Sequence, residues 1–203
     1  MVQSIAAKEV TLAQLRESFG LQVARDPQFF TEWMQPAVTL TPAEEQTLDR
    51  VKQNFESLME DPPMLENTVK MVVLSPLLDL AGFYRSPYAI ETEPSIELTA
   101  TDGDTTVRGR IDVLVLQRHF WLLVIESKRS DFSVTRGLPQ ALSYMLANPA
   151  KDKPSFGLIM NGNEFLFVKA IAHPTAQYAT SRLFSLINPG NELQDILKIM
   201  KGL

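Results

Sequence analysis

Two acidic side chains and a lysine stand at the ends of two neighbouring apolar runs. Asp112 opens the first run, and Glu126 and Lys128 close the second. Successive side chains of a strand face opposite ways, so Glu126 and Lys128 share one face while Ser127 points to the other. Two carboxylates held close together repel each other unless a cation joins them. We therefore expect Asp112 and Glu126 to bind a hard divalent cation such as magnesium.

Lys128 adds a chemical role to this pair. Hydrolysis of a phosphodiester develops negative charge on the phosphoryl oxygens and the leaving group, which a metal ion and an ammonium group stabilise. The residue types therefore predict metal-dependent hydrolysis of a nucleic-acid backbone. General acid and base catalysis on a small molecule by the two carboxylates is a further interpretation. Lys128 and the arginines near it favour a phosphate-bearing substrate instead.

Length and composition limit the other classes of site. The 203 residues, 45% of them hydrophobic, suffice for one domain with a sizeable core. Cysteine is absent and the two histidines, His119 and His173, lie far apart in the chain, which argues against disulfides, thiolate zinc sites and most imidazole metal sites. The first residues lack a basic region followed by an apolar core, and no apolar run reaches membrane-spanning length. We expect a cytoplasmic protein without membrane attachment.

The net charge of -5 is unevenly distributed along the chain. Residues 1–104 carry seven basic and seventeen acidic side chains, whereas residues 105–140 carry six basic and three acidic ones. The positive charge thus lies where the site is predicted, and a local field can outweigh net charge. This balance predicts weak, salt-sensitive DNA binding without a partner's help. Four arginines are candidate DNA contacts, although each is equally well explained as a solvated side chain: Arg108, Arg110, Arg129 and Arg136.

The first sixty residues indicate a helical scaffold. Helix-start signals stand at Thr11 and at the capping box that begins with Thr41 and ends with Glu44. Prolines after Asp61 break the chain, and we place a domain boundary there. The predicted organisation is a helical N-terminal extension over residues 1–61 and an α/β domain with a C-terminal helix over residues 62–203.

The patterns after this boundary predict an alternation of helices and strands. A helix over residues 65–82, bent at Pro76, carries Glu66 in its first turn, where the helix dipole alone would favour a carboxylate. On a second helix, Gln140 and Tyr144 lie one turn apart, and an exposed glutamine beside a packed tyrosine is the simpler explanation. The predicted strands cover residues 88–99, 111–117, 120–128, 155–160 and 164–169, with a tight turn at Asn161-Gly162 between the last two.

This order of helix, three strands, helix and two strands resembles the core of the PD-(D/E)XK nucleases over roughly residues 62–170. More narrowly, the chain is similar to the N-terminal nuclease domain of type I restriction enzyme R subunits. Four segments carry the resemblance: Glu66 with Ser-Pro-Leu-Leu-Asp-Leu-Ala-Gly-Phe downstream, Gly109-Arg110-Ile111-Asp112, Val124-Ile125-Glu126-Ser127-Lys128-Arg129, and Gln140-Ala-Leu-Ser-Tyr144.

The resemblance implies a restriction-endonuclease-like α/β core, in which a mixed central sheet is flanked by helices. It implies that Asp112 and Glu126 bind Mg²⁺ or Mn²⁺ together with the backbone carbonyl of Ser127. Lys128 would stabilise or position the attacking water. Ile111 stands where the family's name has proline, a change that leaves the oxygen ligands of Asp112 in place.

Three further residues receive roles from the resemblance alone. Glu66 would complete the acidic cluster. Gln140 and Tyr144 match a Gln-x-x-x-Tyr motif that would orient DNA or catalytic groups beside the metal.

The expected activity is restriction-related endonuclease cleavage of DNA. Type I R subunits join this domain to an ATP-driven translocase, for which 203 residues leave no room, so a separate translocase or specificity subunit is an expected partner. The alternative is a non-catalytic DNA-binding or complex-assembly module that retains the nuclease fold and docks through its acidic N-terminal region. Retention of all four charged site residues argues against that alternative. The strand type of the substrate, RNA as a substrate, a repair role and the oligomeric state, a dimer included, stay open.

Overall fold

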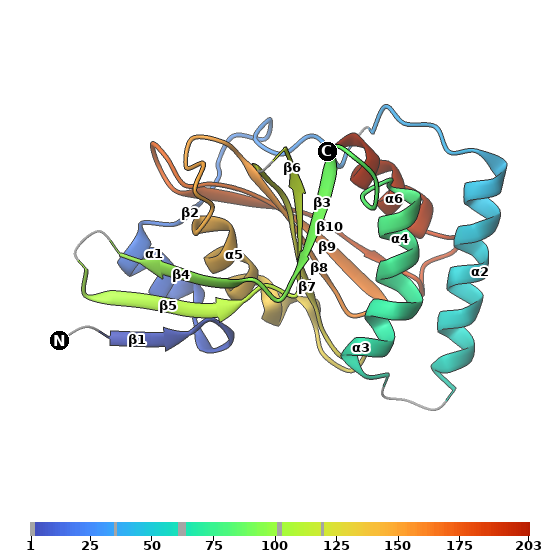
Figure 1. Ribbon diagram of the computed structural model, residues 1–203, viewed down its shortest axis with the longest axis horizontal. Helices are drawn as coiled ribbons and strands as arrows, with labels where there is room; N and C mark the ends of the chain where they lie inside the picture. Colours follow the sequence, from blue (N-terminus) through green and yellow to red (C-terminus); the bar gives the residue numbers. More distant parts are fainter. Residues whose placement is uncertain (1–2, 35, 61–63, 101–102, 119) are drawn as a thin grey trace.

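The chain folds as a mixed α/β structure around a large central sheet with helices on both faces (Figure 1). The computed structural model describes residues 3–34, 36–60, 64–100, 103–118 and 120–203. The predicted α/β class, with a mixed sheet flanked by helices, is confirmed. Within the described ranges, no helix is both long enough and apolar enough to cross a membrane.

The large sheet contains both parallel and antiparallel pairs. In spatial order its strands are β2 (Gln22–Val23), β10 (Gln177–Ser185), β9 (Glu164–Ile171), β8 (Ser155–Met160), β7 (Phe120–Ser127), β6 (Val113–Gln117) and β3 (Tyr88–Thr92). Pairing is parallel between β7 and β8 and between β10 and β2, and antiparallel elsewhere. Four of these strands, β6 to β9, match the predicted apolar runs. β10 was not predicted, because polar residues interrupt its apolar pattern.

A second, three-stranded sheet lies beside the large one (Figure 1). Its middle strand β5 (Thr105–Arg110) pairs with β1 (Gln3–Ala6) in parallel and with β4 (Ser95–Thr99) in antiparallel orientation. The strand predicted over residues 88–99 is therefore two strands in different sheets, β3 and β4. Pro94 stands at the division, where proline's missing N–H removes a ladder hydrogen bond.

The N-terminal sixty residues are only partly helical, which corrects the predicted helical extension. Helices α1 (Leu12–Phe19) and α2 (Pro42–Leu58) begin where predicted, and α2 has the predicted capping box at Thr41. Thr11 also forms a capping box, with Gln14. However, β1 and β2 place this region in both sheets. These strands have four and two residues, too few for an alternating pattern to reveal them. The predicted boundary falls on residues 61–63, which lie outside the described ranges, and it stays a prediction.

The helix predicted over residues 65–82 is divided into three parts. Helix α3 (Glu66–Val69) continues through a π turn, η2 (Lys70–Leu74), into α4 (Ser75–Leu80). We predicted a bend at Pro76, and the irregularity lies one turn earlier, in the π turn η2. The physical reason is that proline has no N–H to donate and its ring displaces the carbonyl of the preceding turn. The remaining helices are α5 (Leu138–Leu146) and α6 (Leu193–Gly202).

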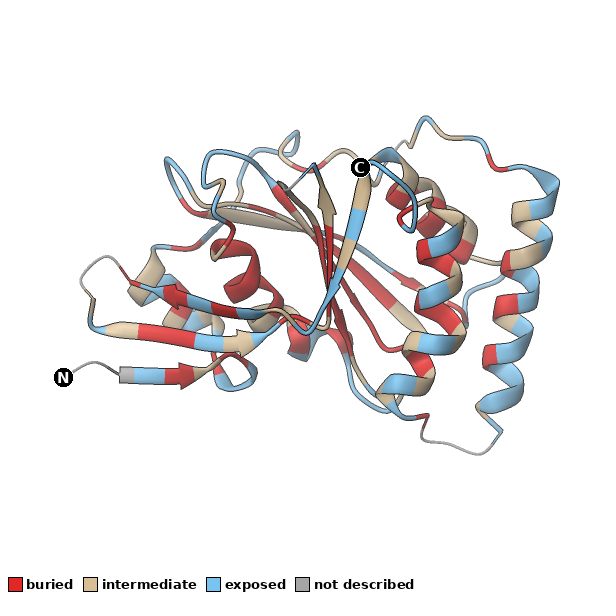
Figure 2. Cartoon of the chain, viewed as in Figure 1, coloured by how far each residue is buried: buried red, intermediate tan, exposed pale blue. Residues whose placement is uncertain are grey.

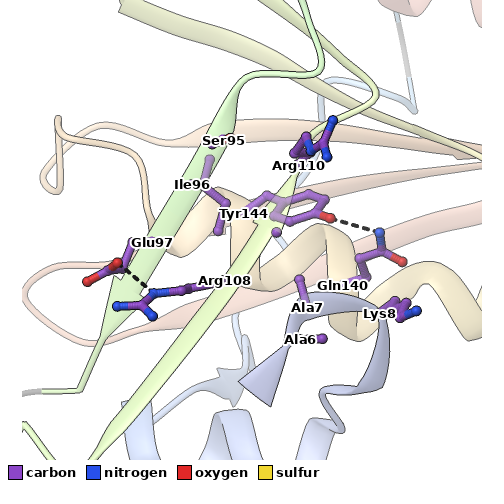
Figure 3. A pocket seen from close by; sticks show the side chains of 11 residues that line it. Ala6, Ala7, Lys8, Ser95, Ile96, Glu97, Arg108, Arg110, Gln140 and Tyr144 are labelled. Carbon is purple, nitrogen blue, oxygen red and sulfur yellow. Dashed lines mark hydrogen bonds and ion pairs between the residues drawn. The ribbon is translucent and has the colours of Figure 1, made fainter. Parts of the chain in front are cut away.

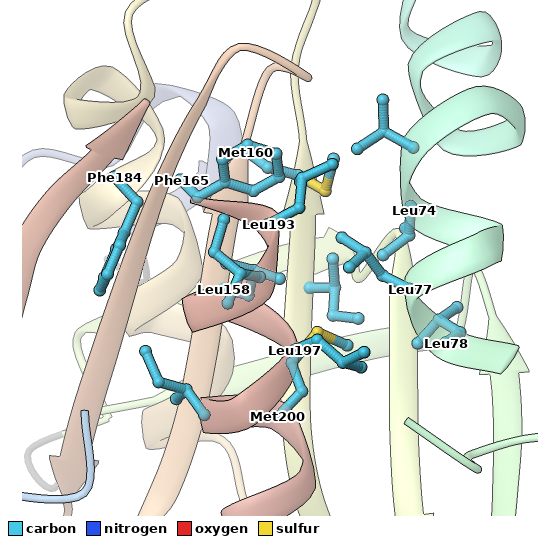
Figure 4. Packing of buried hydrophobic residues seen from close by; sticks show 14 of the residues in the cluster. Leu74, Leu77, Leu78, Leu158, Met160, Phe165, Phe184, Leu193, Leu197 and Met200 are labelled. Carbon is cyan, nitrogen blue, oxygen red and sulfur yellow. The ribbon is translucent and has the colours of Figure 1, made fainter. Parts of the chain in front are cut away.

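The large sheet separates two hydrophobic cores. One face packs against α2, the α3–α4 segment and α6. Figure 4 shows side chains of the α3–α4 segment and α6 against those of the strands. The other face packs against α5, α1 and the 3-10 turn η1 (Ala7–Glu9). Along β7, Leu123 and Ile125 enter the first core and Val124 enters the second. Both faces of the central strands are therefore buried (Figure 2), as their continuous apolar runs predict.

Candidate active site

The β6–β7 ladder sets the spacing of the two carboxylates predicted from the sequence. Val113 pairs with Ile125 and Leu114 with Val124. Extending this antiparallel register by one residue puts Asp112 opposite Glu126. Glu126 follows Val124 by two residues, so its side chain lies on the α5 side of the sheet. The two acidic groups thus meet at one end of the sheet.

Asp112 is held by both of its carboxylate oxygens. Oδ1 accepts a hydrogen bond from the Lys70 ammonium at 2.9 Å, and Oδ2 accepts one from the backbone N–H of Ser127 at 2.7 Å. Burial raises the pKa of Asp112 above its usual value, although both hydrogen bonds oppose this effect. Asp112 is therefore well oriented in an environment that disfavours its charge.

Glu126 is the more deeply buried carboxyl group, with 3% of its side chain exposed. Its Oε1 accepts a hydrogen bond from Lys128, whereas Oε2 is buried and has no hydrogen-bond partner among the described residues. Burial, and next the charge of Asp112, raises the pKa of Glu126 to about 8. At neutral pH and without a cation, this carboxyl group favours its protonated form.

A chain of hydrogen bonds links the site to helix α5. The Lys128 ammonium also donates to Gln140 Oε1 at 3.0 Å, and Gln140 Nε2 donates to Tyr144 Oη at 2.8 Å. Tyr144 is 1% exposed, and burial raises the pKa of its hydroxyl group. The tyrosine ring lies close to Gly109, where an added Cβ would come within 3.0 Å of the tyrosine Oη. Gln140 and Tyr144 therefore fix Lys128 rather than point to solvent.

Glu66 enters the site through Lys70, a residue that the sequence analysis did not single out. The Lys70 ammonium lies 2.8 Å from Glu66 Oε1 and 2.9 Å from Asp112 Oδ1. Burial lowers the pKa of Lys70, but its hydrogen bonds to the two carboxylates outweigh burial and raise it. The four-residue spacing of Glu66 and Lys70 on a helix is the sequence signal that could have identified this contact.

A cavity of about 710 Å³ opens next to Gln140 and Tyr144 (Figure 3). It lies between η1, strands β4 and β5, and helix α5, and its basic lining residues are Lys8, Arg108 and Arg110. Arg108 pairs with Glu97 across the strands, and this contact is largely exposed. Lys8 is exposed as well, and the sequence analysis did not select it. This cavity joins positive charge to the α5 side of the site.

The four predicted DNA-contacting arginines divide into two groups. Arg108 and Arg110 line the cavity, whereas Arg129 and Arg136 do not. Arg129 forms an exposed ion pair with Asp131, and the Arg136 guanidinium lies 5.3 Å from the centre of the Phe132 ring.

The structure brings together the six residues predicted to be catalytic, in two linked groups. Lys70 joins Glu66 to Asp112, and Lys128 joins Glu126 to Gln140 and Tyr144. No three acidic, histidine or cysteine side chains in the described ranges are placed to hold one metal ion. A cation here would have two carboxylates and other oxygen ligands. The predicted Ser127 carbonyl ligand stays a prediction, and His119 lies outside the described residues.

Comparisons with known proteins found a similar solved structure and a matching family. A fragment described as an HsdR subunit of a type I restriction enzyme from Vibrio vulnificus YJ016 has 23% sequence identity and a TM-score of 0.42. The likeness covers 68% of this chain and 26% of that one, so the chain spans about a quarter of the matched protein. Curated protein sequences give no match. The family described as type I restriction enzyme R protein N terminus matches residues 6–175. The chain therefore belongs to this family of type I restriction enzyme R protein N-terminal regions.

Proposed function

We propose that this chain is a metal-dependent nuclease with a restriction-endonuclease-like core that hydrolyses DNA phosphodiester bonds in restriction. The observation that carries the proposal is the buried Oε2 of Glu126, which has no partner among the described residues and stands beside Asp112 and Lys128. Burial makes the charged forms of both carboxyl groups unfavourable. A divalent cation between them would relieve this cost.

The donor set fits a hard cation, Mg²⁺ or Mn²⁺. Carboxylate and carbonyl oxygens are the ligands that such ions prefer, and Asp112, Glu126 and the Ser127 carbonyl would supply them. When bound, the ion would stabilise negative charge on the phosphoryl group and make a coordinated water more acidic.

Lys128 would hold the attacking water or a phosphoryl oxygen. Its ammonium has three donors, of which Glu126 and Gln140 take two, so one remains for the substrate. The amide of Gln140 is oriented from both ends, because its oxygen accepts from Lys128 and its nitrogen donates to Tyr144. Together these bonds restrict Lys128 to the Glu126 side of the site, which is the preorganisation that electrostatic catalysis needs.

The cavity lined by Lys8, Arg108 and Arg110 is the proposed path of the DNA backbone. Gln140 and Tyr144 line it, and Gln140 hydrogen-bonds to Lys128 of the site. The ion pairs of Arg108 and Arg110 with glutamates are more than half exposed, so exchanging these partners for phosphates costs little. We expect Arg129 and Arg136 to contact DNA outside this cavity.

The test is cleavage of supercoiled plasmid and single-stranded DNA with Mg²⁺, Mn²⁺ or chelator. We expect metal-dependent cutting that falls by about 10²-fold or more in Lys128→Ala, as is typical when a charge-stabilising donor is lost. Lys198→Ala, which removes a lysine paired with Asp195 on α6, is the control and should cut like the wild type.

Two results would decide against the proposal. Equal cutting by wild type and Lys128→Ala would mean that the observed activity does not come from this site. Absence of cutting, combined with DNA binding in a mobility-shift assay, would favour the non-catalytic module. A difference between plasmid and single-stranded DNA would identify the substrate.

A further inference from the structure

Lys70 occupies the space between two carboxylates of the site. Its Nζ lies 2.8 Å from Glu66 and 2.9 Å from Asp112, and 21% of its side chain is exposed. Glu66 matters beyond this contact, because its negative charge acts on both Asp112 and Glu126. The positive charge of the Lys70 ammonium therefore offsets the negative charge of the acidic cluster on the side where Glu66 lies.

A second metal ion would need this same space. Two-metal nuclease sites hold their ions about 3.5–4 Å apart and share a carboxylate between them. In this site the shared carboxylate would be Asp112, because Glu126 lies on one side of it and Glu66 on the other. Magnesium binds oxygen at about 2.1 Å, so an ion between Glu66 and Asp112 would overlap an ammonium that contacts the same two oxygens.

We propose that Lys70 replaces a second metal ion, so that this site binds a single divalent cation, on the Glu126 side of Asp112. The inference rests on the proposed function, since it assumes that Asp112 and Glu126 bind metal. In this arrangement Glu66 pairs with Lys70 and is not a ligand of the metal ion. Glu66 is then a positioning residue, which acts on the site through the ammonium group.

The backbone at Lys70 positions its side chain beside Glu66. Lys70 is the first residue of the π turn η2, and its carbonyl accepts the backbone N–H of Ser75. Such wide turns are rare and are found frequently at functional sites. Here the turn follows directly after α3, so Lys70 is still four residues along a regular helix from Glu66 while the segment beyond it packs into the core.

The experiment counts bound Mn²⁺ per chain of 203 residues by titration calorimetry and by the electron paramagnetic resonance signal of free Mn²⁺. We expect one ion for the wild type and two for Lys70→Met, which keeps much of the side-chain volume but removes the charge. The double variant Lys70→Met/Glu66→Gln should return to one ion. Lys52→Met is the matched control, because Lys52 is similarly buried and pairs with a glutamate four residues away on α2. It should bind one ion.

A companion variant keeps the test decisive if Lys70→Met does not fold cooperatively. Glu66→Gln alone changes a more exposed side chain and should leave the number of bound ions at one. Two ions in the wild type, one of them lost in Glu66→Gln, would overturn this inference and leave the proposed nuclease in place. One ion in a folded Lys70→Met variant would also overturn it. No bound ion in the wild type would overturn the proposed function together with this inference.

Discussion

Replacing Glu126 by glutamine should remove a loss of stability that the metal-free protein undergoes as the pH rises. The Glu126 side chain is 3% exposed and its pKa is raised from 4.5 to about 8. The unfolded chain therefore releases this proton near pH 4.5, whereas the folded chain keeps it until about pH 8. Between these values the folded state holds more protons, so the free energy of unfolding falls as pH rises. Glutamine has the same shape and cannot ionise.

The pKa difference sets the size of the effect. At 1.36 kcal/mol for each unit of pKa, the contribution of Glu126 lowers the free energy of unfolding by less than about 1 kcal/mol at pH 5 and by about 3 kcal/mol at pH 7. Glu126→Gln removes this loss. Since the substitution also changes the contact with Lys128, the informative quantity is how the stability difference between variant and wild type varies with pH.

The assay is urea unfolding of both proteins in chelator at several values between pH 5 and pH 8. We expect the advantage of the variant to grow by about 2 kcal/mol between pH 5 and pH 7. Glu97→Gln is the control, because Glu97 is exposed and paired with Arg108, and its stability profile should run parallel to that of the wild type. A constant difference between Glu126→Gln and wild type would mean that Glu126 is ionised in the folded protein, which would refute this reasoning.

Three further predictions concern packing, metal and DNA. Gly109→Ala should lower the free energy of unfolding, measured in urea titrations, by about 1–3 kcal/mol. The reason is that the added Cβ would lie 2.6 Å from a side-chain methyl group of η1. Gly202→Ala is the control and should not lower the stability, because a Cβ there would meet open space. Mg²⁺ at about 100 times its dissociation constant should raise the free energy of unfolding by about 2.7 kcal/mol; Asp112→Asn should lose this gain, and an equal gain in both proteins would contradict the metal site. Lys8→Ala/Arg110→Ala should weaken DNA binding and reduce the slope of log affinity against log salt by about 2 in fluorescence anisotropy, since each phosphate contact contributes about 0.9; an unchanged slope would exclude the cavity as the DNA path.

Local sequence determined the elements that carry the site. The apolar run that ends in Glu126 and Lys128 forms β7 as predicted, and side-chain alternation alone predicts that these two residues share a face. The helix starts at Thr11 and Thr41 were also predictable, since a capping box is complete within four residues. The two strands joined by Asn161-Gly162 follow from the same kind of local turn chemistry.

Tertiary structure decided which of these elements meet. β1 pairs with β5, about a hundred residues later in the chain, and no local pattern specifies that partner. The contact of Lys70 with Asp112 likewise depends on how the α3–α4 segment packs on the sheet. The same is true of the cavity beside Tyr144, to which η1, β4, β5 and α5 contribute.

The division has a physical reason. Side-chain alternation, helix capping and turn conformation depend on residues within a few positions of one another. The sequence therefore determined the strand that carries Glu126 and ends just before Lys128, and the helix that carries Gln140 and Tyr144. The pKa of Glu126, the orientation of Asp112 and the place of Lys70 depend on burial and on charges brought together from distant segments. Only the packed structure decided these properties, because burial and the distances between charges arise when the sheet and its two covering layers assemble.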